Sequence, residues 1–168
     1  MSNRKIAFFD RDGVINRKAA EHYYVTQVAD FAFNEGFFEV LGWVFDHGFT
    51  PVVITNQRGV ARGLMSEARL QEIHAHMNAQ LVARGLPALR VFYCPHERET
   101  CVCRKPAPGL IKAVQQEFGI TDLSDSILIS DAEAEIIMGK NCGIGYNFLV
   151  ESDIGMRVLL PRLQAELL

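Results

Sequence analysis

Lys5-Ile-Ala-Phe-Phe9 is an apolar run that stops abruptly at the polar turn Asp10-Arg-Asp-Gly13. A short apolar run without strict alternation, bounded by turn residues, is typical of a strand covered on both faces. Three later runs have the same character, and a last strand is expected near residues 145–150. The three later runs span residues 51–55, 90–93 and 126–129.

Segments with helical periodicity fill the intervals between these strands. Ser66 and Pro108 are typical of a helix start, and Gly119 is typical of the position just after a helix end. Strands that alternate with helices predict an α/β fold with a central, mostly parallel sheet, and residues 1–168 are predicted to form a single domain. The predicted helices span 37–45, 66–84, 108–118, 132–139 and 154–168, with an interruption at Pro161.

The composition excludes several classes of protein. The 168 residues are 49% hydrophobic and 22% charged, as in ordinary globular domains. A net charge of −3 provides no basic field for a nucleic-acid backbone. No apolar run approaches the roughly 18 residues that span a bilayer, and the first ten residues lack the pattern of a signal peptide. We therefore expect a cytoplasmic monomer without nucleic-acid or membrane partners.

Carboxylates follow the first predicted strand directly. Ligands of open parallel sheets bind at the carboxyl ends of the strands, so Asp10 is expected at a catalytic edge. Such a carboxylate can be a nucleophile or a metal ligand, and Asp12 can point into the same cleft as a general acid and base. A solvated acidic turn is the alternative.

Other predicted strands also end in polar residues. Thr55, Asn56, Gln57 and Arg58 follow the second strand, where a hydroxyl group and free backbone N–H groups can hold phosphate oxygens. A plain polar turn would have the same composition. Asp131 follows the fourth strand, where together with Asp10 it would form the all-oxygen site that Mg²⁺ prefers.

Three thiols and an imidazole lie within ten residues of the loop after the third strand. Cys94, His96, Cys101 and Cys103 have the spacing C-x-H-x4-C-x-C. This set suits a closed, tetrahedral and therefore structural Zn²⁺ site. A group of free loop cysteines is the alternative, and Cys142 is interpreted as a small core residue.

Further charged and titratable residues have less specific patterns. Arg104 and Lys105 follow the zinc loop as adjacent cations suited to phosphate, or as a solvated basic pair. Glu135 could support the predicted magnesium site or be a surface charge of a helix. His74 and His76 fall on the second predicted helix, where surface or packing roles are favoured over metal binding.

The order of these motifs along the chain resembles that of the haloacid dehalogenase superfamily of phosphatases. The resemblance is closer to the branch that carries Asp-x-Asp-Gly, Thr-Asn-Gln and a Cys-x-His…Cys-x-Cys-Arg-Lys-Pro loop, and it covers residues 5–150. That branch contains the D-glycero-D-manno-heptose 1,7-bisphosphate 7-phosphatases and the histidinol-phosphate phosphatases. It implies a Rossmann-like, haloacid dehalogenase-type three-layer fold with a zinc loop and without a large cap domain.

The resemblance also implies roles for individual residues. Asp10 would be the nucleophile that forms a phosphoaspartyl intermediate, and Asp12 the acid that protonates the leaving group and then activates water. Thr55 and Lys105 would hold the transferring phosphoryl group, and Arg104 would recognise the substrate. The implied Mg²⁺ ligands are Asp10, the Asp12 main-chain carbonyl and Asp131. The sequence departs from the usual Gly-Asp-Lys at the fourth strand, where it has Ser130-Asp131-Ala132.

The resulting expectation is a Mg²⁺-dependent phosphatase with a structural Zn²⁺. Its expected substrate is a small phosphate monoester, foremost the 7-phosphate of D-glycero-D-manno-heptose 1,7-bisphosphate. Small loops, including the zinc loop at 94–103, would shape an open pocket. Histidinol phosphate is the alternative substrate within the class, and a noncatalytic or regulatory relative is the alternative outside it.

Overall fold

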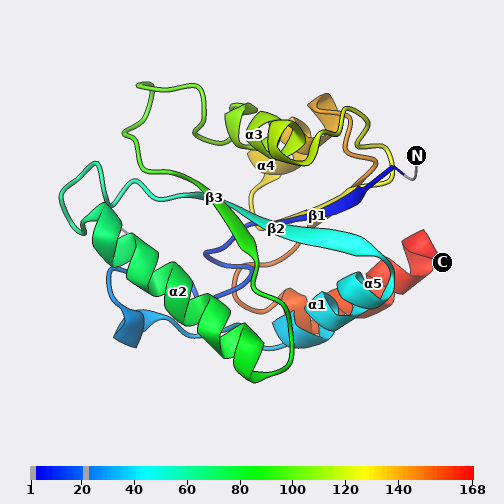
Figure 1. Cartoon of the computed structure of the whole chain (residues 1–168), viewed down its shortest axis with the longest axis horizontal. Coiled ribbons are helices and arrows are strands. Elements are labelled where there is room, and N and C mark those ends of the chain that lie inside the picture. The colour runs from blue at the N-terminus through cyan, green and yellow to red at the C-terminus, as the bar shows by residue number, and fades with distance from the viewer. Residues whose placement is uncertain (1–2, 21–22) are drawn as a thin grey trace.

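The computed structural model describes residues 3–20 and 23–168 and contains one five-stranded sheet. The strands have the spatial order β3-β2-β1-β4-β5, and every neighbouring pair is parallel. Figure 1 shows the sheet between two layers of helices. The strands are β1 (Lys5–Phe9), β2 (Phe49–Asn56), β3 (Arg90–Cys94), β4 (Ile127–Ser130) and β5 (Tyr146–Leu149).

Alternate residues of the strands belong to two separate cores. Phe9 of β1 packs in the core that contains residues of α1, α2 and α5, whereas Phe8 packs in the core that contains residues of α3 and α4. A strand buried on both faces needs apolar residues at successive positions, which explains the uninterrupted run in β1. The helices are η1 (Val28–Asp30), α1 (Phe37–Asp46), α2 (Glu67–Ala83), α3 (Gly109–Phe118), α4 (Glu133–Asn141) and α5 (Met156–Leu167).

The chain reverses its direction of strand addition at β1. It adds β2 and β3 on one side of β1, and then β4 and β5 on the other side. Parallel sheets bind ligands at such a switch point, outside the carboxyl ends of the strands. The residues that follow β1 and β4 therefore meet at the position where a site is expected.

The predicted three-layer α/β architecture is confirmed, and each predicted strand and helix is present with shifts at its ends. The expected helix signals act as predicted: Ser66 accepts a hydrogen bond from the Arg69 backbone N–H at 3.1 Å, and Gly119 adopts a φ of 65° after α3. No helix in the described part of the chain is long and apolar enough to cross a membrane.

The predicted interruption at Pro161 is wrong, because α5 runs through this residue. A proline inside a helix lacks the N–H that would bond to the carbonyl four residues earlier, here that of Arg157. Arg157 is exposed, so water can satisfy its carbonyl. Leu159 and Leu163 are fully buried on either side of the proline and hold both parts of the helix against the core.

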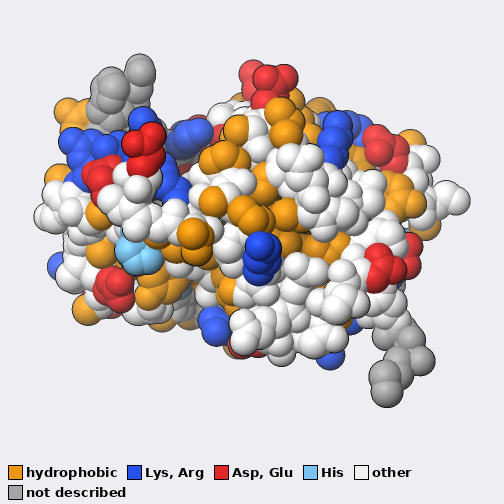
Figure 2. All heavy atoms as spheres, turned by 90° about the horizontal axis from the view of Figure 1, so that it is seen from above, with side chains coloured by type: hydrophobic (Ala, Val, Ile, Leu, Met, Phe, Trp, Pro, Cys, Tyr) orange, Lys and Arg blue, Asp and Glu red, His pale blue; other side chains and the backbone are white. Residues whose placement is uncertain are grey.

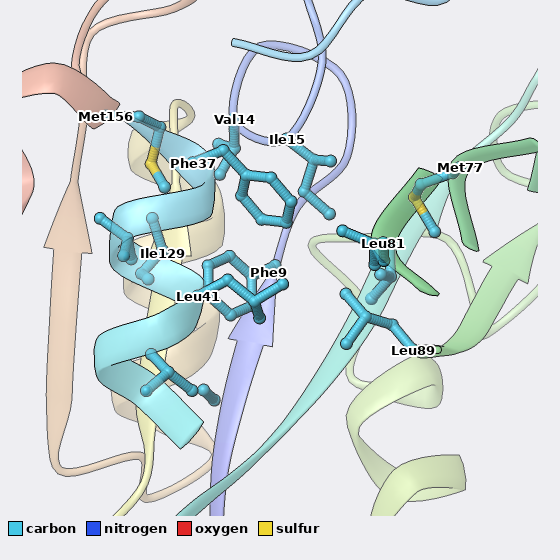
Figure 3. Packing of buried hydrophobic residues seen from close by; sticks show 14 of the residues in the cluster. Phe9, Val14, Ile15, Phe37, Leu41, Met77, Leu81, Leu89, Ile129 and Met156 are labelled. Atoms are coloured by element: carbon cyan, nitrogen blue, oxygen red, sulfur yellow. The ribbon is translucent and has the colours of Figure 1, made fainter. Parts of the chain in front are cut away.

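The core beneath the site is densely aromatic and aliphatic. Figure 3 shows Phe9 beside Phe37 and Leu41 of α1. The rings of Phe9 and Phe37 meet edge to face with centroids 5.7 Å apart. This packing fixes the end of β1, and hence the position of the turn that follows it.

Truncation of Leu41 should destabilise the whole domain. Leu41 is fully buried, so Leu41→Ala should lower the free energy of unfolding by about 2–5 kcal/mol through lost burial and a residual cavity. Val82→Ala is the matched control, because Val82 is 58% exposed on α2. Denaturant titration measures both, and equal losses in the two variants would contradict the assigned core.

Candidate active site

A cleft of about 500 Å³ lies over the carboxyl ends of β1, β2 and β4. Its lining comes from segments far apart in the sequence, including the turn after β1, the loop after it and the loop between β3 and α3. Residues of opposite charge face one another across it. The charged residues include Asp10, Asp12, Arg104, Lys105 and Asp131, and Thr55 also lines the cleft.

Asp10 is the first residue after β1 and is held by main-chain and side-chain contacts. Its N–H donates to the Ile129 carbonyl at 3.1 Å, and its Oδ1 accepts from the Arg11 N–H at 2.8 Å. The Lys105 Nζ lies 2.8 Å from the same oxygen. One oxygen is thus fixed by donors, an arrangement that orients the carboxylate towards the cleft.

Lys105 is buried between two carboxylates. Its Nζ contacts Asp10 Oδ1 at 2.8 Å and Glu135 Oε2 at 3.0 Å, and its side chain is 1% exposed. Burial raises the pKa of Asp10 to about 8, with Glu135 and Asp131 adding to the shift and Lys105 opposing it. Glu135 and Asp131 thus place negative charge near Asp10, and Lys105 partly offsets it.

Asp12 is held by three neighbours on the opposite side of the turn. Its Oδ1 accepts from Arg11 Nη2 and Asn16 Nδ2, each at 2.9 Å, and its Oδ2 accepts from Gln57 Nε2 at 2.9 Å. Burial opposes ionisation here. The Arg11 guanidinium and the Asn16 and Gln57 hydrogen bonds nevertheless hold the pKa of Asp12 below its usual value.

The residues predicted to bind phosphate after β2 have different surroundings. Thr55 lines the cleft, and its Oγ1 accepts from Gln57 Nε2 at 3.0 Å. Asn56 also lines the cleft, but its side chain bonds both main-chain groups of Lys105, at 2.9 and 3.0 Å. Arg58 pairs with Glu97 of the zinc loop. Asn56 and Arg58 thus join the end of β2 to that loop.

Asp131 lies at the end of β4, against Gly13 of the turn after β1. Gly13 has a φ of 91°, and a Cβ on it would lie 2.2 Å from Asp131 Oδ2. Glycine is therefore required there both by the backbone and by the approach of the carboxylate. Lys18 Nζ lies 3.0 Å from Asp131 Oδ2, and the Ser152 hydroxyl donates to the same oxygen.

Ser130, which belongs to the unusual Ser130-Asp131-Ala132 sequence at the end of the fourth strand, makes two hydrogen bonds at the site. Ser130 Oγ donates to Glu135 Oε2 at 2.6 Å and accepts from the Ala132 N–H at 3.2 Å. The hydroxyl thus holds Glu135 where it contacts Lys105. A second cation, Lys18, reaches Asp131 from the loop after β1.

The structure decides between the two alternatives for Glu135 and adds contacts that the sequence does not predict. Glu135 is buried at the site, where it contacts Lys105, and is not a surface charge. His74, for which the sequence favours a surface or packing role, is buried and contacts Arg11, a residue without a role in the sequence prediction. Lys18 is also missing from it. The sequence around a single helix histidine or loop lysine does not indicate a role in the site, because the residue that it contacts lies far away in the sequence.

The oxygen groups at the switch point fit a magnesium ion. Asp10 and Asp131 offer hard carboxylate ligands, and both line the same cleft. Mg²⁺ would be held by Asp10, Asp131 and the Asp12 main-chain carbonyl. When bound, it supplies neutralisation and polarisation of phosphoryl oxygens.

The predicted zinc ligands come together in the loop between β3 and α3. The ligand atoms of Cys94, His96, Cys101 and Cys103 all lie within 4.8 Å of one another. Burial and the neighbouring thiols raise the pKa of Cys103 to about 12, so a bound cation is needed to keep it a thiolate. The set fits a structural Zn²⁺ with no open position.

The zinc loop belongs to a charged end of the molecule. Figure 2 shows Lys and Arg side chains gathered, with acidic ones among them, at the end where the loop between β3 and α3 lies. Arg98 and Arg104 of this region line the cleft. Arg104 Nη1 is buried and has no hydrogen-bond partner among the residues that the structure describes.

Comparison with known proteins agrees with this geometry. The family model for polynucleotide kinase 3 phosphatase matches residues 5–145. A D-glycero-alpha-D-manno-heptose-1,7-bisphosphate 7-phosphatase of Photorhabdus laumondii is 36% identical over 156 residues, with 88% of this chain and 83% of that protein covered. A D-glycero-beta-D-manno-heptose-1,7-bisphosphate 7-phosphatase of Vibrio cholerae is 34% identical over 153 residues, with coverages of 86% and 80%.

A solved structure shares the fold. The D,D-heptose 1,7-bisphosphate phosphatase of B. bronchiseptica, complexed with magnesium and phosphate, aligns with a TM-score of 0.80 and 28% identity. The alignment covers 94% of this chain and 86% of that chain. The fold and the cleft are those of a haloacid dehalogenase-type phosphatase. Within that class, the chain belongs to the family of D-glycero-D-manno-heptose-1,7-bisphosphate 7-phosphatases, and it is a phosphoric monoester hydrolase.

Substitution of Asp10 tests the nucleophile. Asp10→Asn should abolish phosphate release while the protein stays folded, because an amide does not attack phosphorus. Asp46→Asn, which changes an exposed carboxylate of α1, should leave the rate unchanged. Phosphate release and circular dichroism decide the matter, and near-normal turnover of Asp10→Asn would exclude a phosphoaspartyl mechanism.

Removal of one zinc ligand tests the loop. Cys103→Ser should reduce bound zinc and lower kcat/KM by about 10–100-fold, because Arg104 and Lys105 follow this residue directly and lose their fixed position. Cys142→Ser is the control, since Cys142 lies outside the cluster. Elemental analysis and kinetics measure the two effects. Unchanged kinetics in a zinc-free Cys103→Ser protein would show that the metal does not position the cleft.

Proposed function

We propose that the chain hydrolyses D-glycero-D-manno-heptose 1,7-bisphosphate at its 7-phosphate, with Asp10 as nucleophile and Mg²⁺ as cofactor. The observation that carries the proposal is one cleft lined by several cations, which would offer two places for phosphate. Asp10 and Lys105 lie at one, and the partly buried Arg104, whose Nη1 has no hydrogen-bond partner among the described residues, would provide the other. A bisphosphate would occupy both.

The chemistry follows from the positions of the two aspartates. An Asp10 oxygen would attack phosphorus as the ester P–O bond breaks. Asp12, which is ionised in the free protein, would carry a proton in the substrate-bound state and pass it to the departing sugar oxygen. Water would then attack the phosphoaspartyl group, with Asp12 taking a proton from it, and release inorganic phosphate and the free carboxylate. Lys105 would offset charge on the phosphoryl oxygens, since phosphoryl transfer depends mainly on positioning and electrostatic stabilisation.

The relatives support the choice of substrate. They are named for the alpha and the beta anomer of the same bisphosphate. Hydrolysis of this sugar would place the enzyme in the supply of lipopolysaccharide precursors. The sugar is polar, and the loop residues Lys18, Tyr23 and Tyr24 provide polar groups at the edge of the cleft.

We further propose that residues 1–168 act as one domain, as a cytoplasmic monomer without nucleic-acid or membrane partners. Leu159 and Leu163 of α5 pack in the same core as Ala7 and Phe9 of β1, which supports a single folding unit. The net charge of −3 supports a small-molecule rather than a nucleic-acid partner.

A substrate comparison with an arginine variant tests the proposal. Arg104→Ala should raise KM for the heptose 1,7-bisphosphate about 10–100-fold, as expected for one lost hydrogen-bonded charge pair. It should change KM for the heptose 7-monophosphate little, because that ester lacks the 1-phosphate. Arg69→Ala is the matched control, since Arg69 lies on α2 with its side chain 51% exposed.

The wild type should prefer the bisphosphate over histidinol phosphate and over a nucleoside 3′-phosphate. Phosphate release from both anomers, the 7-monophosphate and these two esters ranks the candidates by kcat/KM. A higher kcat/KM for histidinol phosphate would establish the alternative substrate. A preference for the nucleoside 3′-phosphate would overturn the sugar assignment.

A further inference from the structure

We propose that His74 is a positioning residue of the hydrolysis. It acts through Arg11 and holds the Asp12 carboxyl group where this group can give its proton to the leaving oxygen. The inference rests on the proposed function for the role of Asp12. It gives helix α2, which carries His74, an indirect role in the reaction.

Arg11 is a fully buried cation that connects the two residues. Its side chain is 0% exposed, and its Nε and Nη2 donate to Asp12 Oδ1 at 3.3 and 2.9 Å. On the far side of the guanidinium, Nη1 lies 3.1 Å from His74 Nε2. A guanidinium has donors only, so His74 Nε2 must accept, and the ring is neutral with its hydrogen on Nδ1.

His74 is itself fixed by its helix. It is 4% exposed, and its neighbours Ile73 and Met77 on α2 are fully buried in the core. Its ring lies 5.9 Å from that of Tyr93. The position of Nε2 is therefore set by the packing of α2 and not by a mobile loop.

Loss of this acceptor would leave a buried Arg11 N–H without a partner. Such a group costs more than the hydrogen bond alone contributes, so the guanidinium would turn towards another acceptor. The hydrogen bonds of Asn16 and Gln57 would remain on Asp12, but the two from Arg11 would change direction. The Asp12 carboxyl group would stay in the cleft with a less defined orientation.

The dependence on leaving group separates positioning from a merely structural role. A sugar alkoxide is a poor leaving group and needs a proton from Asp12 in the transition state. A nitrophenolate leaves readily without one. A misplaced acid should therefore reduce kcat/KM for the sugar ester and spare the aryl ester, whereas partial unfolding reduces both equally.

The experiment compares kcat/KM for heptose 1,7-bisphosphate and p-nitrophenyl phosphate in four variants. His74→Leu removes the acceptor, and His74→Gln keeps one near the position of Nε2. Asp12→Asn provides the benchmark for a missing acid. His76→Leu is the matched control on the same helix, because His76 packs against the Phe31 ring and not against Arg11.

A smaller fraction of folded enzyme lowers both kcat/KM values by the same factor and therefore leaves their ratio unchanged. His74→Leu should lower kcat/KM for the sugar ester about 10–100-fold, within the range for general acid catalysis and for a misplaced group. The aryl ester should lose less than about threefold, well below that range. His74→Gln should restore most of the sugar activity, and His76→Leu should keep the wild-type ratio.

Equal losses on both esters, or no loss in His74→Leu, would overturn the inference. If His74→Leu does not fold, His74→Phe provides the same ratio, because its ring lacks an acceptor nitrogen and a cleft of about 300 Å³ beside residue 74 leaves room for it. A benchmark Asp12→Asn that loses both activities equally would instead refute the assigned acid. The failure of the proposed function and that of the His74 inference are thus distinguishable.

Discussion

The buried ammonium of Lys105 joins three parts of the chain at one point. It contacts Asp10 after β1 and Glu135 on α4, and it is delivered by the residues that follow the zinc loop. An unpaired charge at this depth would be strongly unfavourable, so Lys105 and its carboxylates require one another. The zinc cluster and the paired hydrogen bonds of Asn56 fix the backbone that brings this cation to the cleft.

Local patterns in the sequence predict much of the fold and much of the cleft. Residues 6–9 are all apolar because both faces of β1 are covered, and a run this short, bounded by turn residues, favours a strand. Polar residues directly after such runs must gather at the carboxyl edge of a parallel sheet. The spacing of Cys94, His96, Cys101 and Cys103 likewise brings the ligands together within one loop.

Contacts between distant segments could not be predicted in this way. His74 and Arg11 are 63 residues apart, and Lys18 and Asp131 are 113 apart, so their pairing depends on how α2 and the loop after β1 pack. The path of α5 through Pro161 also depends on packing, because buried leucines on both sides outweigh the local preference of proline. Secondary-structure propensity is a property of a single residue, whereas these contacts and this packing depend on residues that lie far apart in the sequence.

The strand order has a consequence for how the protein matures. Asp10 is made within the first ten residues, but the carboxylates opposite it, Asp131 and Glu135, belong to the last quarter of the sequence. On the ribosome, β1 and β2 can pair long before β4 emerges to occupy the other side of β1. Asp10 is therefore present early in an incomplete site. The cluster of Asp10, Lys105, Asp131 and Glu135 is complete only once the last quarter of the sequence has been made.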